Sequence, residues 1–367
     1  MPRRKTSSTF VTIIDVARES GFSPSTVSIV LNEAPLSVRI AQTTKERIRK
    51  TAEELGYRPN ASARLLRTRR SQTIGVMIFD LSDPFCTLIL RGIEQALQRT
   101  QYLPIMMDAN NNRKQLGGYL DLLMDRRVEG LVVVANWLFE AGGLLAKLDN
   151  GRLPTIVVGR DLSQDGIRSV VVENQQGGYL AMQHLYALGH RHIAFVRGPA
   201  KLRDSHLRWK GIRAFCAEHD VPIRRELVRQ LPASRDPNSE FDGGLALTDE
   251  LLRSGAAFSA IVAFDDLTAL GAVRALHRAG RRVPQDCSVV GFDDVPPAWF
   301  STPDLTTVRQ PMEAMGQFAA DWVLRQLQPG KRGADRSALL CTLEPTLVER
   351  GSTQALCNLI DKLRVRA

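Results

Sequence analysis

Small polar residues cluster in a predicted helix near the start of the chain, directly after a tight turn. Residues 12–20 and 23–32 predict two short helices joined by a tight turn at Gly21. Thr12 is a suitable N-cap for the first helix, and Ser23 followed by Pro24 is a suitable start for the second. The second helix carries small polar side chains, which can approach base edges in the major groove. This arrangement is typical of a helix-turn-helix.

A second set of candidate residues follows predicted strands farther along the chain. Asp293 comes after an apolar run and can accept hydrogen bonds from hydroxyl groups or amines, while the adjacent Phe292 offers an apolar face for a ring. Asp83 precedes Pro84 and is also a suitable N-cap. Asp266 fits two roles equally well, as a helix N-cap or as a site residue. Because α/β folds bind ligands at the carboxyl ends of parallel strands, these residues predict a binding cleft.

Two kinds of structure are expected to position these residues. A third helix over residues 42–55 completes a three-helix domain at the N-terminus. From residue 72 onward, short apolar runs alternate with amphipathic helical stretches, which predicts parallel sheets covered by helices. The length of this region favours two doubly wound lobes over a single sheet. Strands are expected at 73–79, 103–107, 130–135, 155–158, 192–196, 260–264 and 287–291.

The charge of the chain is unevenly distributed. The 367 residues carry a formal net charge of +10. Residues 1–70 hold 14 Lys and Arg against 6 Asp and Glu, whereas the remaining residues hold 35 against 33. A basic module followed by a nearly neutral body indicates a polyanion partner for the module. The body alone would suit a solute-binding receptor without a transcriptional role. The basic charge of residues 1–70 argues against this alternative.

Composition and motifs disfavour several other classes of protein. No apolar run approaches the ~18 residues of a membrane span, and no apolar stretch follows the basic N-terminus as in a signal peptide. The five scattered cysteines argue against a disulfide framework or a zinc site and fit a reducing cytoplasm. The glycine-rich nucleotide-binding motifs and the serine-hydrolase motif are missing, so neither an enzyme nor a cofactor is expected. The histidines show no metal-ligand spacing, and His190 is expected to be a structural turn residue.

Several separated motifs resemble, in the right order, the LacI/GalR (lac repressor/gal repressor) family of transcription regulators. They are Thr-Val-Ser-x-Val-Leu-Asn at 26–32, Leu-Gly-Tyr-Arg-Pro-Asn at 55–60, Leu-Gly-His-Arg-His-Ile-Ala at 188–194, Val-Gly-Phe-Asp-Asp at 290–294 and Leu-Val-Glu-Arg-Gly-Ser at 347–352. The resemblance covers residues 11 to about 353. It implies a homodimeric repressor that binds a palindromic DNA operator. It also implies a small effector, a sugar or a related polar metabolite, held between two lobes like those of periplasmic binding proteins.

The resemblance also implies which residues of the first module contact DNA. Base-reading positions on the second helix are Ser25, Thr26, Ser28, Ile29 and Asn32. Phosphate-contacting or helix-positioning sites are Thr12, Ser23, Thr44, Tyr57 and Asn60. In the hinge, Leu66 matches a leucine that wedges between the central base pairs, and Ala63 lies on the same face.

Two residues of this module depart from the family pattern. Ile29 replaces an arginine that is common in the recognition helix, so the preferred bases differ from familiar operators. Ala41 stands where a serine often caps the third helix, and Thr43 or Thr44 is expected to take over that cap.

For the effector, the resemblance implies that Arg208 grips the ligand, because a fork of donors suits a sugar diol or a carboxylate. Asp265 is expected to face the cleft, since the family has a polar residue there that touches the ligand. The remaining residues of the predicted effector site are Asp83, Phe85, Asp204, Phe292 and Asp293. Gly159 replaces a sugar-binding aspartate of many relatives, and the loop near Ser239 lacks an aromatic residue of some relatives, although Phe241 is close.

The predicted organisation has five parts. They are a basic tail over 1–10, a helix-turn-helix domain over 11–57, a hinge over 58–71, a two-lobed effector-binding and dimerisation domain over 72–353, and a tail over 354–367. The tail is too short for a coiled coil, so a dimer is expected rather than a tetramer. The expected partners are an operator, an effector and a second copy, with no membrane.

Overall fold

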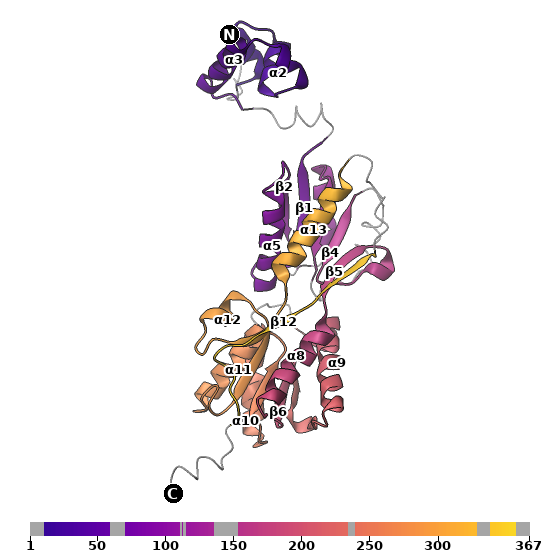
Figure 1. Ribbon diagram of the computed structural model, residues 1–367, viewed down its shortest axis with the longest axis vertical. Helices are drawn as coiled ribbons and strands as arrows, with labels where there is room; N and C mark the ends of the chain where they lie inside the picture. Colours follow the sequence, from indigo (N-terminus) through magenta and orange to yellow (C-terminus); the bar gives the residue numbers. More distant parts are fainter. Residues whose placement is uncertain are drawn as a thin grey trace, which may run out of the picture. The chain divides into compact units, whose positions relative to one another are not determined.

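The structure is a computed structural model that describes residues 11–58, 70–110, 112, 115–135, 153–233, 239–328 and 338–356. The chain forms two compact units, divided between Ser71 and Gln72 (Figure 1). None of the described helices combines the length and the apolar character that crossing a bilayer requires.

The first unit contains three α-helices and a short 3-10 helix. Their bounds are α1 (Ile13–Ser20), α2 (Pro24–Leu31), η1 (Pro35–Arg39) and α3 (Gln42–Glu54). A small core joins the three α-helices, formed by Val16, Ala17, Val27, Val30, Ile48 and Ala52. The predicted helices are therefore confirmed to within one or two residues at each end.

Local side-chain hydrogen bonds explain where these helices begin. Thr12 and Asp15 form a capping box at the start of α1, and Gly21 ends that helix with a φ of 77°. At the start of α2, the Ser23 side chain accepts a hydrogen bond from the Thr26 backbone N–H. The expected cap of α3 is wrong, because Ala41 is the N-cap and no side chain bonds to the free N–H groups there. Thr43 and Thr44 already lie inside the helix, whereas a cap requires the residue that precedes it.

The second unit contains two sheets, each in its own lobe. The strands of the N-terminal lobe, in sheet order, are β11 (Leu340–Leu343), β5 (Arg168–Val172), β4 (Thr155–Val158), β3 (Gly130–Val134), β1 (Thr73–Ile78) and β2 (Leu103–Asp108). All pairings in this sheet are parallel. Helices α5 (Pro84–Leu97) and α13 (Met312–Gln326) lie side by side on one face (Figure 1). Helix α6 (Leu116–Asp125) packs on the other face. The side chains of β1 alternate between the two cores, as expected for a strand buried on both faces.

The C-terminal lobe repeats this architecture. Its strands, in sheet order, are β12 (Thr346–Val348), β10 (Thr306–Arg309), β9 (Ser288–Asp293), β8 (Ala260–Ala263), β6 (Ile193–Arg197) and β7 (Val228–Gln230). Only β12 among these strands pairs antiparallel. Helices α8 (Asn174–Ala187) and α9 (Arg203–Glu218) cover one face, while α10 (Ser239–Arg253) and α11 (Asp266–Arg278) cover the other. Two short helices, η4 (Arg225–Leu227) and α12 (Pro296–Phe300), complete the lobe, and η3 (Ser163–Asp165) belongs to the N-terminal lobe.

The chain passes between the lobes three times. It leaves the N-terminal lobe after β5, returns between β10 and α13, and leaves again between β11 and β12. The expected two lobes are confirmed, but the sequence did not reveal that β11 and α13 return to the first lobe.

Five strands were not predicted from the sequence. They are β5, β7, β10, β11 and β12. Arg168 in β5 interrupts an apolar pattern, yet it is buried with its guanidinium 5.1 Å from the centre of the Trp322 ring. His190 is a buried turn residue as predicted, with its ring nitrogens 2.9 Å from Ser259 Oγ and 3.1 Å from the Gln354 carbonyl oxygen.

The strand order fixes where a ligand can bind. In each lobe the first strand, β1 or β6, lies between the second strand and the third. From the first strand and the third strand of each lobe, the chain continues in opposite directions along the sheet. A crevice therefore opens at the carboxyl ends of these two strands. In the N-terminal lobe the crevice lies beyond β1 and β3, and in the C-terminal lobe it lies beyond β6 and β8.

Candidate functional site

The first unit presents the start of α2 as a polar surface. Ser23 Oγ lies 2.9 Å from Thr26 Oγ1 and accepts from the Thr26 N–H at 3.1 Å, so both hydroxyls are held by the cap. Ser25 is exposed beside them, while Ser28 and Ile29 are half-buried. The Asn32 side chain donates to the Ser28 carbonyl oxygen at 2.7 Å, which stabilises the end of the same helix.

The other predicted DNA-contacting residues lie on different elements. Thr12 precedes α1, Thr44 is half-buried on α3, and Tyr57 packs against the three-helix core. Asn60, Ala63 and Leu66 lie outside the described residues.

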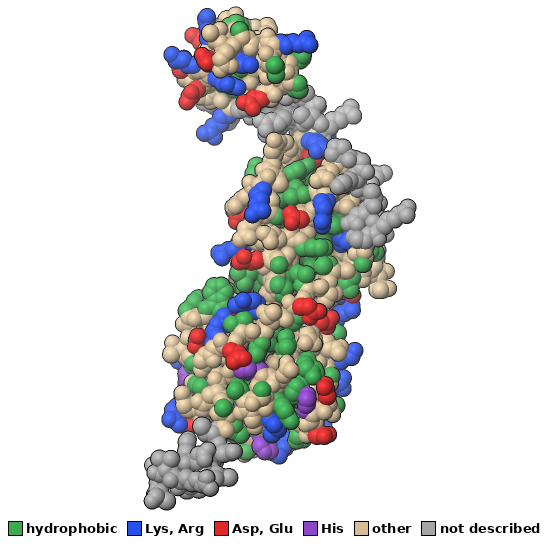
Figure 2. Space-filling view, in the orientation of Figure 1, with side chains coloured by type: hydrophobic (Ala, Val, Ile, Leu, Met, Phe, Trp, Pro, Cys, Tyr) green, Lys and Arg blue, Asp and Glu red, His purple; other side chains and the backbone are tan. Residues whose placement is uncertain are grey.

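The basic character of the first 70 residues does not come from the helices. Residues 11–58 hold 7 Lys and Arg against 6 Asp and Glu, so the three-helix region is nearly neutral. Figure 2 shows side chains of both signs interspersed on this unit. The remaining seven basic residues flank it, within 1–10 and 59–70. The description of the whole module as basic is therefore refined: its excess charge belongs to the flanking segments.

A cavity lies at the carboxyl ends of the strands in the second unit. Its empty space is about 660 Å³, including space open to solvent. Both lobes contribute to its walls. The lining residues are Asp83, Pro84, Phe85, Ala135, Gly159, Leu202, Asp204, Arg208, Glu240, Phe264, Asp265, Leu267, Asp293, Val295 and Gln310. The structure thus brings together six of the seven predicted effector residues, with Phe292 as the exception.

Arg208 is the most constrained side chain of this site. It is 7% exposed, and each of its three nitrogens donates a hydrogen bond. Nε reaches Asn174 Oδ1 at 2.8 Å, Nη1 reaches the Phe264 carbonyl oxygen at 2.6 Å, and Nη2 reaches Asp293 Oδ1 at 3.4 Å. These contacts fix the plane of the guanidinium before any ligand binds.

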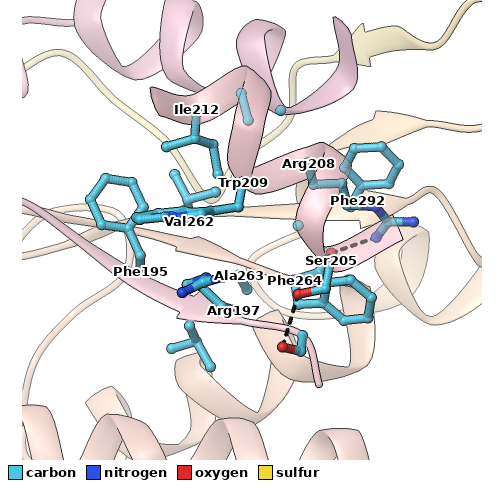
Figure 3. A pocket seen from close by; sticks show the side chains of 15 residues that line it. Phe195, Arg197, Ser205, Arg208, Trp209, Ile212, Val262, Ala263, Phe264 and Phe292 are labelled. Carbon is cyan, nitrogen blue, oxygen red and sulfur yellow. Dashed lines mark hydrogen bonds between the residues drawn. The ribbon is translucent and has the colours of Figure 1, made fainter. Parts of the chain in front are cut away.

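Phe292 supports Arg208 and does not line the cavity. The guanidinium carbon of Arg208 lies 3.6 Å from the centre of the Phe292 ring and 4.6 Å from that of Phe264 (Figure 3). Phe292 is 3% exposed, and it lies among residues of a mainly apolar pocket of about 380 Å³ behind Arg208. The prediction that Phe292 offers a face to a ligand ring is therefore corrected, because the arginine already covers that ring.

The hydrogen bonds at the start of α11 distinguish the roles of Asp265 and Asp266. Asp265 is the N-cap, and its Oδ1 accepts from the Thr268 N–H at 2.7 Å while the residue also lines the cavity. Asp266 is fully buried, where it accepts hydrogen bonds from the Val295 N–H at 2.9 Å and the Thr307 hydroxyl at 2.5 Å. Asp266 is thus neither the cap nor a residue of the cavity wall, and the placement of Asp265 in the cleft agrees with the expectation.

Burial raises the pKa of most carboxyl groups around the cavity. It raises the pKa of Asp83 to about 6, in spite of the hydrogen bond from the Phe85 N–H. It raises the pKa of Asp293 to about 7, although the Arg208 guanidinium opposes the shift. Burial, together with the carboxylate of Asp265, raises the pKa of Glu240. Because a buried charge without a full set of partners is costly, the free cavity holds some of its acids protonated near neutral pH.

Three residues of the site were missed by the sequence analysis. Glu240 lines the cavity from the first turn of α10, next to the segment that was noted for lacking an aromatic residue. Gln310 donates to Asp293 Oδ1 at 2.5 Å, and Asn174 connects Arg208 to Asp204 through its own hydrogen bonds. Of the three, only Asn174 has a signal in the sequence, because it stands at the start of a helical stretch.

The backbone conformation at Gly159 explains why this position departs from the family pattern. Its φ is +88°, and a Cβ atom there would lie 2.8 Å from the Ala135 carbonyl oxygen. An aspartate at this position would be strained in the present backbone, so the glycine contributes space and not a side chain.

Comparisons with known proteins place both units. Residues 12–60 match the model of the lacI family of bacterial regulatory proteins, and residues 182–353 match the model of a periplasmic binding protein-like domain. The HTH-type transcriptional repressor PurR of Pectobacterium atrosepticum is 31% identical, over 93% of this chain and 96% of the relative. The ribose operon repressor of Escherichia coli is 31% identical, over 93% of this chain and 99% of the relative.

A solved structure shows the same arrangement of elements. The lac repressor dimer bound to operator and the anti-inducer ONPF superposes with a TM-score of 0.79 at 27% identity. The match covers 95% of this chain and 100% of that one.

Proposed function

The chain belongs to the LacI family of bacterial regulatory proteins, and we propose on this premise that it represses transcription as an effector-controlled homodimer. The relatives are transcriptional repressors, which favours a regulator over an enzyme. The observation that carries the proposal is the pairing, in one chain, of a helix-turn-helix unit with a two-lobed unit whose ligand-sized cavity lies at the carboxyl ends of both sheets. The solute-receptor alternative lacks support, because the resemblance to repressors includes residues 12–60.

The start of α2 is the part of the first unit that we assign to the major groove. Ser25 is exposed there, at the start of the helix whose cap is formed by Ser23 and Thr26. Base contacts are assigned to Ser25, Thr26, Ser28, Ile29 and Asn32, and phosphate contacts or helix positioning to Thr12, Ser23, Thr44, Tyr57 and Asn60. Ala63 and Leu66 are assigned to the minor groove.

The flanking basic segments supply the attraction to DNA that the helices lack. Seven of the 14 basic residues within 1–70 lie in 1–10 and 59–70. Each phosphate that such a residue neutralises releases a counterion, which makes binding steeply dependent on salt. In this proposal the three-helix domain (11–57) contacts the bases, while the tail (1–10) and the hinge (58–71) bind the phosphate backbone of the DNA. We propose that the chain acts on chromosomal DNA in the cytoplasm of a bacterial cell, which the repressor relatives support.

Effector control acts through the two lobes of the domain over 72–353. The effector site comprises Asp83 and Phe85 on one side and Asp204, Arg208, Asp265 and Asp293 on the other, with Phe292 behind Arg208. A ligand that contacts both lobes favours one relative position of the lobes, and so shifts the population of DNA-binding states. The three connecting segments between the lobes permit such a shift without breaking either sheet.

Selection of genomic fragments by the full-length chain, at near-physiological salt, tests the proposal. We expect enrichment of a palindrome with a flexible pyrimidine–purine step at its centre, bound by two copies of the chain. Salt-sensitive binding without any enriched site, both alone and with added cell metabolites, would contradict sequence-specific repression.

A further inference from the structure

The cavity between the lobes contains far more acid than base. Among the described residues that line it, five carry carboxyl groups and one, Arg208, carries a cation. The acids are Asp83 from the N-terminal lobe and Asp204, Glu240, Asp265 and Asp293 from the C-terminal lobe. An ionised carboxylate only accepts hydrogen bonds, so a ligand must supply donors or positive charge at most of these positions.

Arg208 does not balance these acids. Its guanidinium is already bonded to Asn174 and to the Phe264 carbonyl oxygen, and it forms one ion pair at 3.4 Å, with Asp293. Within the described part of the chain, Glu240 accepts no hydrogen bond and forms no ion pair. Among the described residues that line the cavity, the acids therefore outnumber the cations.

Protons compensate part of that charge in the free protein. Burial raises the pKa of Asp83 to about 6 and that of Asp293 to about 7. Above these values the carboxylates repel each other inside a half-enclosed space. Any bound cation that replaces the protons relieves this repulsion, whereas a neutral ligand does not.

The geometry favours an organic cation over a metal ion. No three His, Cys, Asp or Glu side chains within the described residues are arranged to hold one metal ion. The cavity has about 660 Å³ of empty space, and Phe85 and Phe264 form part of its wall. Aromatic rings beside carboxylates are a favourable environment for an ammonium group on a carbon skeleton.

We propose that the effector is a small primary amine that also carries hydroxyl groups or a second amine, as amino sugars and aliphatic diamines do. Its ammonium group binds among Asp83, Glu240 and Asp265, which come from both lobes. Because the amine contacts both lobes, it holds them together in one arrangement. This inference rests on the proposed function, since it names the chemistry of the effector.

A fractionated extract of the cells that encode the chain tests the inference. Small metabolites are separated on a strong cation exchanger at pH 7, and each fraction is assayed for its effect on binding of the full-length chain to its selected operator. We expect the active compound in the retained fraction. Activity confined to the unretained fraction overturns the inference and leaves effector control intact. If no fraction changes operator binding, effector control itself fails, and the inference fails with it.

A pair of variants tests whether the active compound binds the carboxyl group of Glu240. Glu240→Gln removes a carboxyl group from the cavity, and Glu226→Gln makes the same substitution at an exposed residue of the same lobe. We expect Glu240→Gln to raise the concentration of active fraction needed for half its effect at least tenfold, and Glu226→Gln to leave that concentration unchanged. An equal response of both variants contradicts the assignment.

Proton release distinguishes an amine from a neutral ligand at the same site. Titration calorimetry of the purified active compound, in buffers of different ionisation enthalpy at pH 6.5, measures protons exchanged on binding. An amine that replaces protons on the carboxyl groups releases them into the buffer. A ligand that binds without proton release contradicts the proposed chemistry.

Discussion

Arg208 and Asn174 are held to each other across two packed helices, with Nε of the arginine donating to Oδ1 of the asparagine at 2.8 Å. Asn174 lies at the start of α8 and Arg208 lies within α9. The same asparagine donates to Asp204 at 3.1 Å, so one amide orients two side chains of the cavity.

Arg208→Lys is expected to abolish most of the effector response. A lysine ammonium cannot reach Asn174, the Phe264 carbonyl oxygen and Asp293 at once, and it lacks the planar face that lies on Phe292. The effector concentration that half-changes operator binding should rise at least tenfold. Arg213→Lys, at an exposed position of the same helix, is the matched control and should leave that concentration unchanged. A normal response of Arg208→Lys would show that Arg208 does not take part in effector binding.

Gly211→Ala is expected to destabilise the second unit by about 2 kcal/mol or more. A Cβ atom at residue 211 would lie 1.8 Å from the Gln175 carbonyl oxygen, so α8 and α9 would have to separate. Gly118→Ala on α6 is the control, because nothing lies within 4 Å of its Cβ position and alanine favours helix by about 1 kcal/mol. Urea unfolding of both variants measures the difference. The prediction fails if the two variants unfold at the same urea concentration.

Asp83→Asn should stabilise the ligand-free protein more at pH 8 than at pH 5. Burial raises the pKa of Asp83 in the folded state from 3.8 to about 6. The folded state therefore binds more protons than the unfolded state between these values, and this contribution to stability is lost as pH rises through about 6. Asparagine keeps the N-cap of α5 but does not ionise. The variant should gain about 1 kcal/mol relative to the natural chain between pH 5 and pH 8, given that Asp83 is only half-buried. Thermal unfolding at both pH values provides the measurement, and a gain independent of pH would contradict the raised pKa.

Ala41→Ser should stabilise α3, which begins without a side-chain cap. A serine at this N-cap position accepts a hydrogen bond from a free N–H of the first turn and contributes about 1 kcal/mol. Hydrogen exchange of the α3 amides in the full-length chain should slow by about fivefold for this free energy. Thr12→Ala removes the existing capping box of α1 and should accelerate exchange there. An unchanged rate in α3 would show that Ala41 does not occupy the N-cap position.

Leu66→Ala tests the hinge, which lies outside the described residues. A leucine that wedges between base pairs contributes only at a site that the duplex can kink. We expect weaker binding to the selected operator, by at least tenfold, and little change in binding to unrelated DNA of the same length. Equal losses on both DNAs would exclude the wedge.

Local interactions made much of this structure predictable. The caps at Thr12, Ser23 and Asp83 join a side chain to a backbone N–H two or three residues away, so their pattern is visible in the sequence. The alternation of apolar runs with amphipathic stretches likewise identified the central strands, because these are buried on both faces.

What could not be predicted depends on contacts between distant segments. Glu240 lines the cavity only because α10 packs beside α11, and nothing in its neighbours along the chain marks that position. Phe292 was expected to face the ligand, but Arg208, 84 positions earlier in the chain, already lies on its ring. The strand β12 is only three residues long, so only its pairing with β10 identifies it.

The three passages between the lobes also determine the order in which a growing chain can finish its cores. The N-terminal lobe is begun first, yet α13 and β11 leave the ribosome only after the strands β6 to β10 of the other lobe. Until residue 326 has been synthesised, α5 lacks the helix that packs beside it, and Ile89 and Ile93 lack part of their final cover. A nascent chain that stalls before that point therefore exposes apolar surface in the lobe that was made earliest. This lobe can therefore complete its core only after nearly the whole chain has been translated.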